Sequence, residues 1–134
     1  MPHISGEFNV KMAVEAMSAV AADSGIGRMS LDKQYHGALD ASGSGEMLAY
    51  MDRELGSGAY VAMERVQGTL EGRRGSFLLY HTGTMERGAP GLKVAVVPDS
   101  GRDELSGLGG TLQIRIEGGK HYYDFDYTLG PAVA

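Results

Sequence analysis

Short, glycine-rich connections between segments of alternating apolar and polar residues constrain the fold of this chain more than any other feature. An apolar side chain at every second position is typical of a β-strand with one buried face. Because no connection holds a helix long enough for a parallel crossover, neighbouring strands are expected to run antiparallel. Eight such strands in an open sheet would expose unpaired edges, which closure removes. The sequence therefore predicts an all-β fold, an antiparallel eight-stranded meander closed into a barrel.

The expected strands occupy most of the chain, and a single β-barrel domain over residues 1–134 accounts for all of it. They are residues 4–12, 28–39, 45–52, two strands within 61–85, 91–98, 111–116 and 120–129. A hairpin turn is expected near Ser42 and Gly43, between the second and third strands. Residues 14–27 are expected to form a long loop with local helix, and residues 99–110 a polar connection with room for one helical turn.

Charge and composition exclude several classes of protein. Seventeen acidic against twelve basic residues give a formal net charge of −5, so no nucleic-acid partner is expected, because phosphate binding needs a concentrated positive surface. No stretch approaches the run of about twenty apolar residues that crosses a bilayer, and the first ten residues lack the features of a signal peptide. The chain contains no cysteine for a disulfide or a thiolate metal site. We expect a cytoplasmic protein that contacts no membrane.

The hairpin within residues 61–85 places two ionisable side chains on a face that is expected to be buried. A two-residue turn at Gly72 and Arg73 pairs Glu64 with His81 and directs both side chains into the barrel. The same face is rich in apolar and small residues: Tyr60, Ala62, Val66, Gly68, Phe77, Leu79, Gly83 and Met85.

Glu64 and His81 are the candidate catalytic residues. Burial disfavours the charged form of each group while their mutual attraction favours both, so the pair is a candidate for acid and base chemistry near neutral pH. The alternative is structural, with the two groups satisfying each other and helping to hold the strand register. Both interpretations stay open at this point.

Large side chains on the inner face are the candidate ligand contacts. They are Tyr35, Tyr50, Tyr60, Phe77 and Met85. The turn expected near Ser42 and Gly43 places Tyr35 and Tyr50 on the inner face of facing strands, where their hydroxyl groups could donate to a ligand, although tyrosines in barrels also serve as packing residues. Lys33 lies near a strand end and is expected to extend its ammonium group to water.

No metal and no cofactor are expected. Asp124 and Asp126 share the polar outer face of the last strand, and the four histidines do not cluster in the sequence. No phosphate loop, dinucleotide fingerprint or nucleophile elbow occurs, and Ser76 falls on the polar outer face of its hairpin. Any active site must therefore be assembled from different strands.

Several segments also resemble a known family. GRMSLDKQYHGAL, GEMLAYMD, LKVAVVPDSG, ELSGLGGTLQI, GGKHYYDFDYTL and, most specifically, the ERV-x-GTL-x-GR-x-GSF-x-L-x-H block are similar to the bacterial domain-of-unknown-function family 3224. The resemblance covers nearly the whole chain and implies an allene oxide cyclase-like barrel of eight antiparallel strands. It implies no activity, and it assigns no role to Glu64 or His81, which are the Glu and His of the block.

Three functions remain open. The protein could enclose a small hydrophobic ligand in the barrel lumen, act as a cofactor-free isomerase or cyclase with Glu64 and His81 as the acid and base, or be a packed barrel that works through an oligomer surface. Small inward residues, Gly37, Ala62, Gly68 and Gly83, favour a cavity.

The order of the strands also predicts where a ligand would enter and where copies would meet. An entrance is expected at the end of the barrel that carries residues 15–27, 53–58 and 86–90. A homo-oligomer is expected from the outward apolar residues Val61, Met63 and Leu78.

Overall fold

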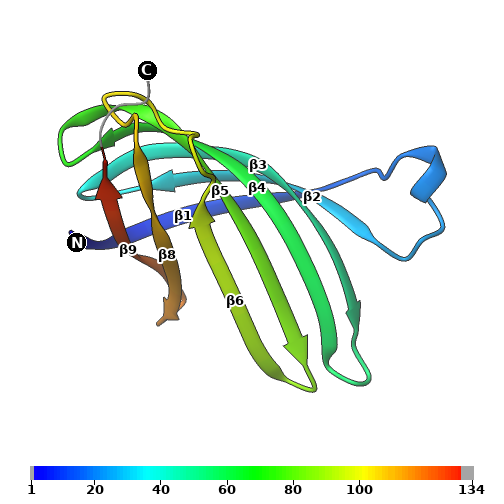
Figure 1. Ribbon diagram of the computed structural model, residues 1–134. Helices are drawn as coiled ribbons and strands as arrows, with labels where there is room; N and C mark the ends of the chain where they lie inside the picture. Colours follow the sequence, from blue (N-terminus) through cyan, green and yellow to red (C-terminus); the bar gives the residue numbers. More distant parts are fainter. Residues whose placement is uncertain (1, 131–134) are drawn as a thin grey trace.

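A computed structural model describes residues 2–130 of the chain, which form one antiparallel β-barrel (Figure 1). The strands are β1 (His3–Glu15), β2 (Gly27–Tyr35), β3 (Leu39–Asp52), β4 (Ser57–Leu70), β5 (Arg73–Glu86), β6 (Ala89–Val96), β7 (Arg102–Asp103), β8 (Leu108–Glu117) and β9 (Lys120–Leu129), with a 3-10 turn η1 (Ala19–Ala21) between β1 and β2. Hydrogen bonds connect them in the order β4-β3-β2-β1-β9-β8-β6-β5, and β5 pairs back onto β4. This pairing closes eight strands into a barrel and confirms the predicted fold; β7 is an additional short strand.

A two-residue turn sets the register of the β4–β5 hairpin. Glu71 and Gly72 join β4 to β5, and both have positive φ, 47° and 83°, as a type I′ turn requires. The turn therefore lies one residue earlier than predicted, with Leu70 paired with Arg73. The predicted direct pairing of Glu64 with His81 is wrong, since Glu64 pairs with Leu79 instead. Because the shift between facing residues is two, every side chain keeps its predicted face.

The connection between β2 and β3 lies earlier in the chain than the sequence suggested. The chain turns at residues 36–38, where Gly37 has a φ of 101°, and residues 40–44, which were predicted to contain the turn, belong to β3. Tyr35 consequently pairs with Ala41, and Lys33 with Gly43. This register reverses the predicted faces of the second half of β3.

The hydrophobic core fills one end of the barrel, which we call the closed end; it carries the turns at 36–38 and 71–72 and the connection 97–107. Phe77 stacks on Phe125 with ring centroids 5.9 Å apart, and both are buried. Leu105, from the connection that was predicted to be a polar loop, is only 1% exposed and belongs to this core. Strand β7 of the same connection pairs with β5 at Gly75 and Ser76. Ser76, predicted to be on an exposed polar face, is buried.

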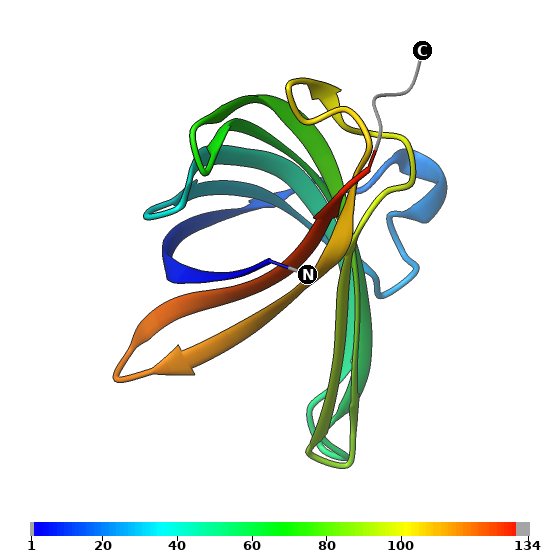
Figure 2. The same ribbon diagram turned by 60° about the vertical axis from the view of Figure 1, so that its left-hand side comes forward.

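The opposite end, which we call the open end, carries the residues 16–26 loop and the turns at 53–56, 87–88 and 118–119. Figures 1 and 2 show the β3–β4 and β5–β6 hairpins extending side by side at this end, away from β8 and β9. Apolar side chains of the open end are exposed, including Met12 (53%), Met51 (48%), Leu92 (47%) and Ile116 (67%). The hydrophobic residues that would close this end are thus in contact with solvent.

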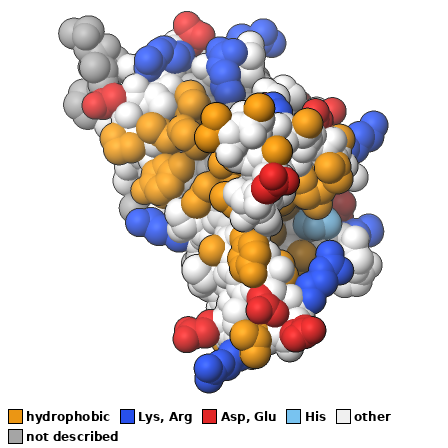
Figure 3. All heavy atoms as spheres, turned by 90° about the vertical axis from the view of Figure 1, so that its right-hand side faces the viewer, with side chains coloured by type: hydrophobic (Ala, Val, Ile, Leu, Met, Phe, Trp, Pro, Cys, Tyr) orange, Lys and Arg blue, Asp and Glu red, His pale blue; other side chains and the backbone are white. Residues whose placement is uncertain are grey.

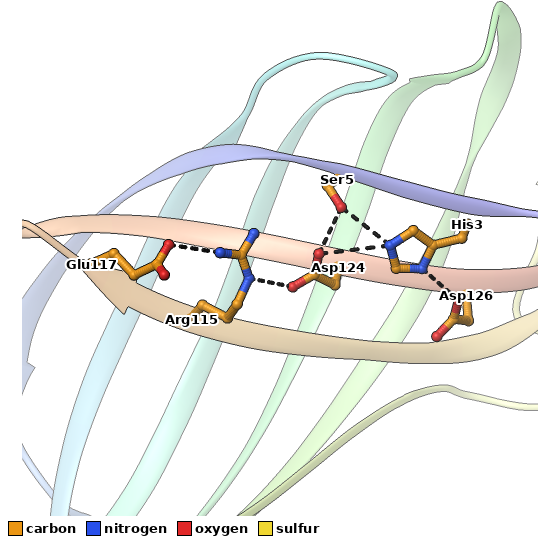
Figure 4. A network of polar contacts seen from close by, with 6 residues as sticks. All are labelled: His3, Ser5, Arg115, Glu117, Asp124 and Asp126. Carbon is orange, nitrogen blue, oxygen red and sulfur yellow. Dashed lines mark hydrogen bonds and ion pairs between the residues drawn. The ribbon is translucent and has the colours of Figure 1, made fainter.

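A polar network on the outer face joins the first strand to the last hairpin (Figure 4). It consists of His3, Ser5, Arg115, Glu117, Asp124 and Asp126. The bond from Arg115, helped by that from Ser5, holds the pKa of Asp124 below its usual value. Ser5 Oγ lies 3.2 Å from His3 Nε2, yet its one hydrogen is donated to Asp124 Oδ1 at 2.6 Å. We therefore interpret this exposed Ser, His and Asp arrangement as a support for the β1–β9 pairing, not as a nucleophile.

Candidate functional site

A hollow of about 180 Å³ lies in the lumen at the point where the core of the closed end stops. We call it the lumen hollow. Its lining is mostly apolar and comes from seven of the strands: Phe8, Val10, Met12, Leu31, Lys33, Met47, Tyr60, Ala62, His81, Ile114 and His121. None of these residues comes from the 16–26 loop, so that loop does not plug the hollow.

A buried ionic cluster lies beside the lumen hollow. Glu64 Oε1 accepts hydrogen bonds from Lys33 Nζ and from His81 Nε2, each at 2.7 Å, and Tyr35 OH donates to Oε2 at 2.9 Å. The side chains of Glu64, His81 and Lys33 are 0%, 3% and 6% exposed. The predicted contact between Glu64 and His81 therefore exists, although it runs diagonally between the strands because His81 directly faces Ala62.

Glycine at position 43 makes room for this cluster. Gly43 lies on the inner face of β3 and pairs with Lys33 on one side and with Val66 on the other. A Cβ atom at Gly43 would collide with Glu64 Oε2 and would lie 3.2 Å from the ring of Tyr35. The absence of a side chain here is what allows the carboxylate to reach both Lys33 and Tyr35.

The cluster holds Glu64 in its charged form. Burial by itself would raise the pKa of this carboxyl, but the hydrogen bond from His81 and the positive charge of Lys33 outweigh burial and lower the pKa below 4.5. Burial, the negative charge of Glu64 and the bond to it raise the pKa of Tyr35 well above its usual value. Glu64 is thus a permanent anion at neutral pH, and all its strong hydrogen bonds are to neighbouring side chains.

The orientation of His81 follows from the charge of Glu64. An ionised carboxylate only accepts hydrogen bonds, so Nε2 of His81 carries a hydrogen and donates it. Nδ1 of His81 makes no hydrogen bond to any residue in the range 2–130. Every fully enclosed side-chain nitrogen or oxygen atom in that range has a partner, so Nδ1 is not fully enclosed. Because His81 lines the lumen hollow, Nδ1 is the nitrogen available to a molecule that enters it.

The structure divides the five predicted ligand contacts between the open end, buried positions and the outer face. Tyr60 and Met85 border hollows at the open end. Tyr35 and Phe77 are each 1% exposed; the hydroxyl of Tyr35 is used by Glu64, and Phe77 packs in the closed end. Tyr50 is 54% exposed, and its predicted inward direction is wrong, because the true β2–β3 turn places it on the outer face of β3. It nevertheless borders the same open-end hollow as Met85.

Three site residues were missed by the sequence-based prediction. Lys33 was expected to reach water, but its ammonium group is buried, lying 5.4 Å from the centroid of the Phe8 ring and bonded to Glu64. Gly43 was assigned to a turn. His121 was given no role, yet it lines the lumen hollow and packs against Phe8 with ring centroids 5.3 Å apart. Correct placement of the β2–β3 turn at Gly37 was the signal that would have placed Gly43 inside and Lys33 next to Gly43, within reach of Glu64.

An apolar groove continues from the lumen hollow along the extended hairpins. This groove, of about 320 Å³, shares Met47 and Tyr60 with the lumen hollow and runs past Met51, Met85 and Leu92. No charged residue lines it. Figure 3, viewed from the side toward which the η1 loop projects, shows hydrophobic side chains over much of this face and charged groups mainly near its margins.

Tyr60 connects the two spaces. Its ring lies over Gly83 of β5, where a Cβ atom would collide with the ring. Burial and, to a smaller extent, the charge of Glu64 raise the pKa of Tyr60, so that its hydroxyl stays a neutral donor. The lumen hollow and the groove therefore adjoin at Met47 and Tyr60, with polar groups at the inner end and apolar groups toward the open end. We refer to the two spaces together as the path.

Two other features of the described residues bear on function. Residues 2–130 contain no group of three or more His, Cys, Asp or Glu side chains placed to hold a metal ion. Within the same range, no helix has the length and hydrophobicity needed to cross a membrane.

Comparisons with known proteins give a family and a solved relative. The family described as "Protein of unknown function (DUF3224)" matches residues 4–127. The crystal structure of a protein with unknown function from the DUF3224 family of Shewanella oneidensis MR-1 is 45% identical to this chain and covers 98% of it and 99% of its own chain, with a TM-score of 0.89. No curated protein matches the sequence.

Proposed function

The chain belongs to the DUF3224 family, whose description names no activity, and from the site itself we propose that the barrel binds a small amphiphilic molecule. The observation that carries this proposal is that the apolar groove adjoins the lumen hollow, whose lining includes His81 and Lys33. An apolar tail fits the groove, and a polar head fits the inner end of the lumen hollow. Concave, mostly apolar sites with a few polar groups are typical of small-molecule binding.

The size of the path supports this division of the ligand. The lumen hollow holds about 180 Å³, the space of about six water molecules at bulk density, which suits a head group and the first few carbon atoms. The groove adds about 320 Å³ of apolar space. Burial of the tail would contribute about 0.8 kcal/mol for each methylene group removed from water.

Filling the lumen hollow is expected to weaken ligand binding. Ala62 lines it and is 5% exposed, so Ala62→Leu should weaken binding of an eight-carbon alcohol or carboxylate about tenfold or more, measured by isothermal titration calorimetry, because the added side chain occupies the ligand's volume. Thr82→Leu is the matched control, since Thr82 is exposed on the outer face of the neighbouring strand. Equal affinity of the Ala62→Leu variant and the wild type, or no binding to the wild type, would refute the proposed function.

Proton transfer by His81 is a second candidate function, favoured by its orientation. Nε2 is held by Glu64, which leaves Nδ1 as the base facing the hollow. In this scheme Glu64 positions the imidazole, instead of exchanging a proton as one half of an acid and base pair. Hydrogen exchange at the α carbon of 2-octanone in D₂O, followed by NMR, discriminates the two: a catalyst accelerates exchange and His81→Gln loses it, whereas a pure binding protein leaves the exchange rate unchanged.

A homo-oligomer also remains a proposal. Leu48, Val61 and Met63 are 40%, 52% and 51% exposed on the outer face of β3 and β4, and Leu48 pairs directly with Val61. Leu78, the third residue of the expected contact, is partly covered by the connection 97–107, since its backbone N–H bonds to Ser100 Oγ at 3.0 Å. The molar mass in solution decides this proposal.

A further inference from the structure

We propose that the head group of the ligand is an anion, of the carboxylate class, and that its binding takes up a proton on His81. This inference rests on the proposed function and names the chemistry of the molecule bound. It starts from the polar side chains that line the lumen hollow: Lys33, Tyr60, His81 and His121. Lys33 and Tyr60 can donate hydrogen bonds, a neutral His121 can donate from one ring nitrogen, and His81 can donate into the hollow once Nδ1 is protonated. No aspartate or glutamate lines the hollow.

The hollow is thus open to an anion at its inner end. Lys33 Nζ has three hydrogens and gives one to Glu64, so further donors remain for a ligand. Glu64 is 0% exposed and lies behind Lys33 and His81, where the bonds to these two groups hold its oxygen Oε1. A cationic head group would face the nitrogen atoms of Lys33 and His81 without a carboxylate to receive it.

The charge of the cluster explains why binding of an anion would add a proton to His81. Glu64 and Lys33 cancel each other, so the cluster carries no net charge while His81 is neutral. An anionic head beside Nδ1 would place His81 between two carboxylates, one on each ring nitrogen, and this arrangement favours the imidazolium form. The bound state would then be neutral again, with the ligand and Glu64 balanced by Lys33 and His81.

The other groups near His81 do not supply the positive charge that would balance the anionic head group. Val94 faces His81 from β6 and Ile114 of β8 lines the hollow, and both are apolar. Tyr60 of β4 is a neutral donor. His121 of β9 is the second imidazole lining the hollow, and a variant must separate its effect from that of His81.

The test is isothermal titration calorimetry of the full chain with octanoate, 1-octanol and octylamine at pH 6 and pH 8. We expect octanoate to bind about tenfold or more tighter than 1-octanol at pH 6, and its affinity to fall toward pH 8 by at most about tenfold per pH unit, the slope for one linked proton. The affinity for 1-octanol should not change with pH. Repeating the titration in two buffers of different ionisation enthalpy should show uptake of up to one proton.

Two variants show which histidine takes up the proton. His81→Gln keeps a polar group beside Glu64 but cannot be protonated, so it should bind octanoate with a flat pH dependence, while His121→Gln should keep the pH dependence. An equal or higher affinity for 1-octanol or octylamine, or a pH-independent affinity for octanoate in the wild type, overturns the inference even if the variants do not fold. If none of the three compounds binds, the proposed function itself fails, which is a different outcome from binding without preference for the anion.

Discussion

Replacing Glu64 with alanine is expected to lower the free energy of unfolding by about 3–5 kcal/mol, the usual effect of removing one partner of a buried ion pair. The ammonium group of Lys33 would then lie in the barrel without its carboxylate partner, and Nε2 of His81 and the hydroxyl of Tyr35 would lose their acceptor. Chemical denaturation of the variant and the wild type at pH 7 measures the difference.

A second substitution shows whether the unpaired charge is the cause. The double variant Glu64→Ala with Lys33→Met should recover part of the loss, because it removes the ammonium group that was left unpaired. Glu46→Ala is the matched control, since Glu46 also forms an ion pair but on the exposed outer face, with Arg28, and its removal should change the stability little. A Glu64→Ala variant as stable as the control would show that the cluster contributes nothing to the fold.

The pH dependence of this difference has a definite sign. The pKa of Glu64 in the folded protein lies below its ordinary value of 4.5. The stability that its charge contributes is therefore present above pH 4.5 and is lost as the pH falls through the lower pKa of the folded state. The difference in the free energy of unfolding between the wild type and Glu64→Ala should become smaller in that acid range. From pH 5 upward, the ionisation of Glu64 adds no further pH dependence to this difference.

Gly43→Ala is expected to have the second largest effect, a loss of about 1–3 kcal/mol in the free energy of unfolding, as for other overpacked core positions. The new methyl group would take the place of Glu64 Oε2 and approach the ring of Tyr35. The carboxylate would have to turn away, which loosens its bonds to Lys33 and Tyr35. Equilibrium denaturation measures the stability, and an NMR titration of His81 reports the change around the imidazole.

Ser44→Ala is the control for this substitution. Ser44 is the next residue on β3 and is exposed on the outer face, so a methyl group there keeps the lumen unchanged. A Gly43→Ala variant with the stability and the His81 titration of Ser44→Ala would mean that the carboxylate does not depend on the space at Gly43.

The inner face of the β4–β5 hairpin was predictable because it depends only on parity. The predicted turn was displaced by one residue, which shifted the facing pairs by two, and a shift of two returns each side chain to the same face. Glu64 and His81 consequently meet even though they are not direct partners. Alternation of apolar residues determines the face of a strand more strongly than it determines which residue lies opposite.

The β2–β3 hairpin could not be read in the same way. Gly37 and Gly43 are both of a residue type that favours turns. The segment that contains them, HGALDASG, has polar and small residues that are compatible with either a turn or a strand. The choice of Gly37 places Gly43 inside, Lys33 beside Glu64, and Tyr50 on the outer face. One misplaced turn therefore hid the position of Lys33 beside Glu64 and gave Tyr50 the wrong direction.

By itself the sequence determined the antiparallel barrel, its closure, and the inward direction of Glu64 and His81, because these follow from local alternation and from connections too short for crossover helices. Only the tertiary structure decided that Lys33 joins them and that the hydroxyl of Tyr35 donates its hydrogen to Glu64. It also decided that the lumen is open at one end and packed at the other. The physical reason is that charge balance and empty volume depend on which strands lie side by side around the barrel, a property that no single segment carries.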